Sequence, residues 1–239
     1  MPTLNDSIPV IEFVGLPGSG KTTLLKALLV SPNLEAHDLV GAVLLERGNL
    51  MWKMLAATTR ILPRTRSRAL RKHLALTLSP SLTELDQSWE EALEQAQNVR
   101  SRFLIGQTLR MYAAIHHTSQ DVLVEEGVLQ RLYSADPGRN PTVAFLASPR
   151  VRAVVYLNTH PEIAMTRLLQ RMQESGSWGV RRFRGHSEAE VFRDLMRNYA
   201  FNGMGIASLA ESHQVVELDG AGSPHEVLQA AERSLRAIR

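Results

Sequence analysis

The chain has no cysteine, few aromatic residues and a small net charge of +3. Without cysteine there are no disulfides, thiolate metal sites or cysteine nucleophiles. Aromatic residues make up 5% of the 239 residues, and we expect the three tryptophans in the core or at its rim, not as a base-stacking platform. No stretch approaches the roughly 20 apolar residues of a membrane-spanning helix. The N-terminal residues lack the basic and apolar regions of a secretory signal, so we expect a cytoplasmic protein.

What is present describes an ordinary globular protein. Hydrophobic residues make up 44% of the chain and charged residues 21%, which is enough apolar material for a sizeable core. We find no internal repeat or low-complexity tract. The length alone allows one large domain or two small ones, and we expect residues 1–239 to form a single domain.

The most informative segment, residues 15–22, reads G-x-x-x-x-G-K-T and directly follows an apolar run at 8–14. Glycines let such a loop turn several N–H groups inward, and the helix that follows adds the positive end of its dipole. At this spacing Lys21 reaches the β- and γ-phosphates, and Thr22 offers its hydroxyl to a phosphate-bound Mg²⁺. The segment predicts a nucleoside triphosphate site formed by these residues: Gly15, Pro17, Gly18, Ser19, Gly20, Lys21, Thr22 and Thr23.

Most of the chain alternates between strand and helix patterns, which is typical of a parallel sheet covered on both faces. Apolar runs predict strands at 8–14, 39–45, 121–125, 152–158 and 214–218. Helices are predicted over 21–30, 161–174 and 224–238, the last two beginning at a proline, where the missing N–H is harmless. The fold class is α/β.

Residues 49–118 interrupt this alternation between the second and third strands. Apolar residues recur there at helical steps, and residues 48–83 hold arginines and lysines but no acidic residue. We interpret the stretch as a helical insertion or lid on the same domain. Its basic part is compatible with a peripheral membrane or nucleic-acid contact, although a solvated helix face is the favoured interpretation.

Two predicted strands end in charged residues. Ligands of a parallel sheet bind beyond the carboxyl ends of its strands, so Glu125 and Glu126 should lie near the phosphate loop. Glu125 suits the Mg²⁺ shell, directly or through water, and Glu126 suits a base that accepts the acceptor's proton. Glu46 and Arg47 would face the acceptor, as a carboxylate for its hydroxyl and a guanidinium for an anionic group. Which of the three glutamates is the base stays open.

Five arginines surround a glycine-containing stretch after the fourth strand. Arg167 and Arg171 lie four residues apart on one helix face, and three more follow at 181, 182 and 184. Phosphoryl transfer spreads negative charge over several oxygens, which a closing arginine-rich lid stabilises while it excludes water. A solvated basic face is the alternative interpretation.

This order of motifs resembles the P-loop nucleoside and nucleotide kinases, in particular thymidylate kinases and deoxynucleoside kinases. The resemblance covers residues 8–48 and 121–238 and rests on GLPGSGKTT, the acidic pair, YLNTHPEIAMTRLLQR, the arginine-rich segment and VVELDGAGSPHEVLQA. It implies a P-loop NTPase fold whose five parallel strands follow the order 2-3-1-4-5, with ATP and Mg²⁺ as the donor. It places Arg167, Arg171 and Arg182 near the donor phosphates and Gly220 near the adenine.

One departure concerns the acceptor. These families carry Asp-Arg or Glu-Arg-Ser after the third strand, where this chain has Glu125-Glu126, so thymidylate is not carried over as substrate. We expect a phosphotransferase that moves the γ-phosphoryl of ATP to a hydroxyl or phosphate of a nucleoside, nucleotide, sugar or other metabolite. The alternative is a P-loop ATPase or switch module coupled through its helical insertion to a protein, nucleic acid or membrane. A homodimer is left open.

Overall fold

A computed structural model describes the strands and helices of an α/β fold. The described residues are 8–38, 120–125, 127–130, 151–180, 183–211 and 213–238, together with Thr108, Met111, Tyr112 and Ile115.

The described strands form one sheet in which all neighbours are parallel. In chain order they are β1 (Ile8–Gly15), β2 (Ala36–Asp38), β3 (Asp121–Val124), β4 (Val151–Asn158) and β5 (Val215–Asp219). Their order across the sheet is β2-β3-β1-β4-β5, so β1 is central. The predicted five-stranded parallel sheet and its 2-3-1-4-5 order are confirmed.

The central strand β1 is buried along its whole length, which explains why its sequence is almost continuously apolar. Its register against β4 shifts between Ile8 and Ile11. Pro9 lies in this irregularity, where its missing N–H removes no regular ladder bond. From Ile11 the strand keeps an unbroken register with β4 up to Gly15, and its end fixes where the glycine-rich loop begins.

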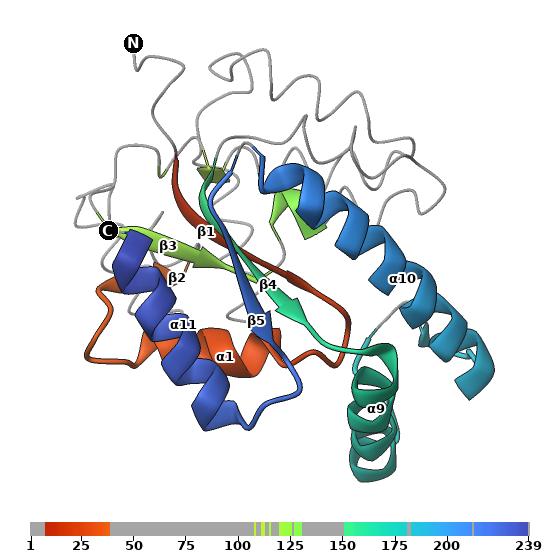
Figure 1. The fold of residues 1–239 in the computed structure, drawn as a ribbon. Coiled ribbons are helices and arrows are strands. Elements are labelled where there is room, and N and C mark those ends of the chain that lie inside the picture. Colours follow the sequence, from red (N-terminus) through yellow and green to blue (C-terminus); the bar gives the residue numbers. More distant parts are fainter. Residues whose placement is uncertain are drawn as a thin grey trace.

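In the described part of the chain, four helices accompany this sheet (Figure 1). Helices α1 (Lys21–Leu29) and α11 (Pro224–Ile238) cover one face, with Leu28 of α1 and Leu235 of α11 in a shared core. Helix α10 (Glu188–Leu209) covers the opposite face, and α9 (Pro161–Ser175) follows the carboxyl end of β4. The sheet is therefore enclosed on both sides, as the alternating sequence predicts.

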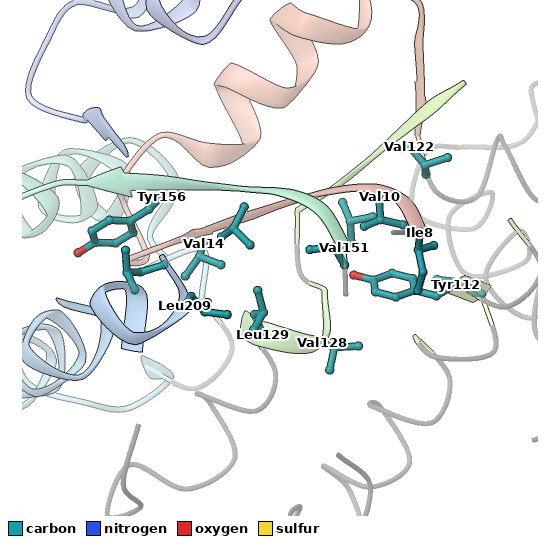
Figure 2. Packing of buried hydrophobic residues seen from close by; sticks show 14 of the residues in the cluster. Ile8, Val10, Val14, Tyr112, Val122, Val128, Leu129, Val151, Tyr156 and Leu209 are labelled. Atoms are coloured by element: carbon teal, nitrogen blue, oxygen red, sulfur yellow. The ribbon is translucent and has the colours of Figure 1, made fainter. Parts of the chain in front are cut away.

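The core on the α10 face joins the sheet to helical residues that precede β3 (Figure 2). Tyr112 lies near Ile8 and Val151 at one end, whereas Leu209 of α10 lies near Tyr156 at the other. Thr108, Met111, Tyr112 and Ile115 are all buried and helical, at the three- and four-residue steps of a single helix face.

The described second strand begins ahead of the predicted run at 39–45. β2 is Ala36–Asp38, and the apolar run itself lies outside the described residues. The described residues of β2 lie at the edge of the sheet and are only partly buried, and they lack the apolar pattern of a central strand. β3 ends at Val124, which leaves Glu125 just beyond the sheet. Apart from the four helical residues above, the insertion at 49–118 is not described, and its extent stays a prediction.

Candidate functional site

The glycine-rich loop, residues 15–22, joins the carboxyl end of β1 to the first turn of α1. Gly18 adopts a positive φ of 83°, and a Cβ there would lie 2.6 Å from the carbonyl oxygen of Ala164 in α9. Gly20 caps α1 with a φ of 99° and no side-chain hydrogen bond. Both positions need glycine, since other residues rarely adopt this backbone conformation. The loop is thus shaped by its own glycines and by contact with α9.

The Lys21 side chain folds back over the loop. Its Nζ donates hydrogen bonds to the carbonyl oxygens of Gly15 at 2.7 Å and Leu16 at 2.9 Å, and to Ser19 Oγ at 3.4 Å. Ser19 itself is buried, whereas Thr22 and Thr23 at the start of α1 are exposed. The ammonium therefore lies within the loop and not in open solvent.

The carboxylate after β3 meets the end of the loop. The hydroxyl group of Thr22 donates a hydrogen bond to Glu125 Oε1. This contact joins the two residues that the sequence predicts as Mg²⁺ ligands, and hydroxyl and carboxylate oxygens are donors that Mg²⁺ accepts. The described residues hold no group of three or more His, Asp or Glu side chains arranged for a metal. A cation here would therefore take its remaining ligands from phosphate and water.

The two arginines of α9 occupy different environments. Arg167 Nη1 donates to the carbonyl oxygen of Ser19 at 3.2 Å, so its guanidinium lies against the glycine-rich loop. Arg171, one turn later, is exposed and packs over Gly179, where a Cβ would lie 2.6 Å from its Cδ and 2.9 Å from its Nη1. Of the two, Arg167 is the one placed beside the loop.

The arginine-rich segment is held by buried aromatic residues. Trp178 and Phe183 belong to a core cluster that also contains Leu16 of the loop and residues of α9 and α10. Trp178 is buried, as the sequence predicts, and Arg184 is exposed. Leu16 thus packs in the same cluster as the anchors of the segment that carries the arginines.

Gly220 follows β5 at the same edge of the sheet. Its N–H donates to the carbonyl oxygen of Asn158 at 2.9 Å, and a Cβ there would lie only 1.8 Å from Thr159 Oγ1. The close approach ties the turn after β5 to the turn after β4. Gly220 is itself buried, and only a residue without a side chain fits there.

Four predicted site residues lie outside the described part of the chain. They are Glu46, Arg47, Glu126 and Arg182. Their roles remain predictions.

Three buried polar residues beside the loop were missed by the sequence analysis. Glu12 of β1 accepts hydrogen bonds from Tyr112 and from the main chain of Gln130, whose side chain in turn contacts Gly15. The one available signal was Glu12 itself, a carboxylate inside an apolar strand. Nothing local in the sequence marks Tyr112 or Gln130 as its partners.

A cavity of about 600 Å³ lies elsewhere, between α10 and the β4–β5 edge, and it shares no residue with the loop. Burial raises the pKa of the Tyr156 phenol in its wall, and Tyr199 and Glu217 add to this rise. None of the described helices combines the length and apolarity needed to cross a bilayer.

Comparison with known proteins finds a similar fold but no similar sequence. No protein-family profile matches the chain, and neither does any curated protein. Among solved structures it is similar to deoxyadenosine kinase from M. mycoides with products dCMP and a flexible dCDP bound. The TM-score is 0.53 and the identity 11%, over 95% of this chain and 99% of the other. A dCTP-bound structure of that kinase matches over the same shares with 12% identity and a TM-score of 0.43. The chain thus has a P-loop nucleoside kinase-like fold.

Proposed function

We propose that this chain is an ATP-dependent phosphotransferase that moves the γ-phosphoryl of ATP to a hydroxyl or phosphate of a small molecule. The observation that carries the proposal is the meeting of three groups at one sheet edge. These are the ammonium of Lys21 inside a complete glycine-rich loop, the Thr22 hydroxyl in contact with Glu125, and the Arg167 guanidinium on Ser19. Together they form a donor site for a nucleoside triphosphate.

The donor half follows from these positions. Main-chain N–H groups of the loop and the N-terminus of α1 cradle the phosphates. Lys21 exchanges the carbonyl oxygens of Gly15 and Leu16 for charged phosphate oxygens, with which its hydrogen bonds are stronger. Arg167 lies close enough to the loop to neutralise charge on the transferred group.

The carboxylates divide between cation and proton. Because Glu125 already contacts Thr22, we assign both to Mg²⁺, which when bound neutralises charge on the β- and γ-phosphates. This leaves Glu126 as the candidate base for the acceptor hydroxyl, with Glu46 as the alternative. Arg182 would join the donor phosphates from the arginine-rich segment, and Arg47 an anionic group of the acceptor.

The acceptor is tested by a panel. ADP release is measured with MgATP alone and then with deoxynucleosides, ribonucleosides, their monophosphates and sugars. Deoxyadenosine and deoxycytidine come first because of the fold shared with a deoxyadenosine kinase. We expect one chemical class to raise turnover well above the rate with MgATP alone, with phosphate recovered on the acceptor. Turnover stimulated only by a protein, nucleic acid or lipid would instead favour the ATPase or switch module.

A further inference from the structure

A fully buried carboxylate lies in the middle of the central strand. Glu12 has no exposed surface, and its side chain shares a sheet face with Val10 and Val14. In the register it sits opposite Val124 of β3 and Val154 of β4. An ionisable group in such apolar surroundings is strongly destabilising unless hydrogen bonds compensate its lost hydration. The hydrogen-bond partners of Glu12 therefore indicate the role of this carboxylate.

One of those partners precedes β3 in the sequence and the other follows it. Tyr112, from the helical residues before β3, donates its hydroxyl to Glu12 Oε2 at 3.0 Å. The main-chain N–H of Gln130, after β3, donates to Glu12 Oε1 at 3.0 Å. Figure 2 shows Tyr112 in the core near Ile8 and Val10. The carboxylate thus fixes the backbone that follows β3.

Gly127 shows how closely this backbone approaches. A Cβ on Gly127 would lie 2.1 Å from Glu12 Cδ and 2.3 Å from the Tyr112 hydroxyl oxygen. Real Cβ atoms essentially never come so near, and both obstacles are buried and hydrogen-bonded. Only glycine lets the chain after β3 lie directly on the Glu12 carboxylate.

The same segment contacts the glycine-rich loop at both of its ends. Gln130 Oε1 accepts the N–H of Gly15, the first loop glycine, at 3.2 Å. At the start of the segment, Glu125 contacts Thr22, the last residue of the loop. Residues 125–130, which we call the clasp, therefore contact both the first residue of the loop, Gly15, and its last residue, Thr22.

The Gly15 peptide unit is the point where this matters for nucleotide binding. Its carbonyl oxygen now accepts from Lys21 Nζ, a bond that a bound triphosphate would take away. Its buried N–H, held by Gln130, faces no such competition. Once Lys21 turns to a phosphate, the Gln130 contact still holds Gly15, together with the pairing of Gly15 with Leu157 of β4.

We propose that Gln130 is a positioning residue for the phosphate loop and that Glu12 is the buried anchor of the clasp that carries it. This inference rests on the proposed function, since it assumes that MgATP binds the loop. The clasp also carries Glu125 and the adjacent Glu126. Through its contacts with Gly15 and Thr22, the clasp holds the phosphate loop and Glu125 next to each other.

The test is Gln130→Met, which keeps the length of the side chain and removes its acceptor oxygen. Loss of the partner of a buried N–H should raise the Kd for MgATP about tenfold. The rise in Tm produced by MgATP should shrink accordingly. A merely structural role would instead lower the stability of free and bound protein equally and leave the Kd unchanged. Calorimetric titration with MgATP and thermal unfolding measure the two quantities.

Arg152→Met is the matched control. Arg152 pairs with Asp121 at 2.6 Å near the amino ends of β4 and β3, far along the strands from the loop. Its replacement should lower Tm while the Kd for MgATP stays within about twofold, since the loop contacts are intact. This control separates general destabilisation from loss of the clasp.

Amide exchange in the unmodified protein gives a second measurement that needs no folded variant. We expect the Gly15 amide to stay protected when MgATP is bound. Rapid exchange of this amide in the complex, or a Gln130→Met protein that binds MgATP as tightly as the unmodified chain, would overturn the inference alone. An unmodified chain that does not bind MgATP would overturn the proposed function as well.

Discussion

The ammonium group of Lys21 has three oxygen acceptors within its own loop, two of them main-chain carbonyls. These neutral acceptors hold the side chain over the loop, next to where phosphates would lie. A charged phosphate oxygen makes a shorter and roughly twice as strong hydrogen bond with an ammonium. In the proposed donor site, nucleotide binding would require the Lys21 side chain to exchange these hydrogen-bond partners for phosphate oxygens.

Lys21→Ala should therefore remove both a phosphate ligand and a transition-state charge. We expect turnover to fall by at least about a hundredfold, which is typical for the loss of one stabilising donor. The KM for ATP should rise as well. Steady-state ADP release measures both. Lys26→Ala, an exposed lysine later in the same helix, is the control with an equal change of charge, and it should leave turnover unchanged. Turnover close to normal in Lys21→Ala would contradict the donor site.

At the scale of elements, two helices begin with the same local device. Ser187 and Glu190 form a reciprocal capping box at the start of α10. Ser223 and Glu226 make the same pair of contacts at the start of α11. The hydrogen bonds from each serine hold the pKa of the Glu190 and Glu226 carboxyls below their ordinary 4.5. Both helices are thus tied in part to ionised carboxylates.

This arrangement predicts a particular acid dependence. A carboxyl whose pKa is lowered by folding stabilises the folded protein at pH values above its ordinary pKa. This stabilisation is lost as the pH falls through the lowered pKa. The double variant Glu190→Gln, Glu226→Gln should therefore have a lower Tm than the unmodified chain at pH 7. The gap should narrow as the pH falls below 4.5 and through the lowered pKa values of the two carboxyls. Thermal unfolding across this range measures it, and a gap independent of pH would mean that the carboxylate charge does not matter.

At the scale of the whole molecule, a shared core joins the loop to the arginine-rich segment. Leu16 of the loop packs with Trp178 and Phe183, which flank the arginines at 181 and 182. Helices α9 and α10 supply the rest of this cluster. The residues on either side of positions 181 and 182 are therefore anchored in the same core as Leu16 of the loop.

Replacing Arg181, Arg182 and Arg184 together by glutamine should slow phosphoryl transfer on the order of a hundredfold. It should also raise the share of ATP that is hydrolysed without transfer, because the lid no longer excludes water. Comparing ADP release with phosphorylated acceptor gives both values. A charge-matched control replaces the exposed Arg193, Arg233 and Arg236 of α10 and α11. If the two triple variants behave alike, the arginines form only a solvated face.

The sequence by itself determined the parts of this protein whose signals are local. The glycine-rich loop, the strand before it and the helix after it are consecutive, so spacing alone places Lys21 and Thr22 together. The starts of α9 and α11 at prolines, and the two-sided burial of β1, follow equally from neighbouring residues. Hydrophobic periodicity and glycine conformation act over a few residues, which is why they can be inferred from one chain.

Only the tertiary structure decided which distant residues meet at the loop. Gly15 and Gln130 are 115 positions apart, and Glu12 lies 100 positions from Tyr112. Such contacts depend on the pairing of β1 with β3 and on the strand register, which fix the positions of side chains far apart in sequence. The same holds for Arg167, which touches the loop while Arg171 does not. A helix face shows which arginines are neighbours, but the packing of that helix decides which of them reaches the glycine-rich loop.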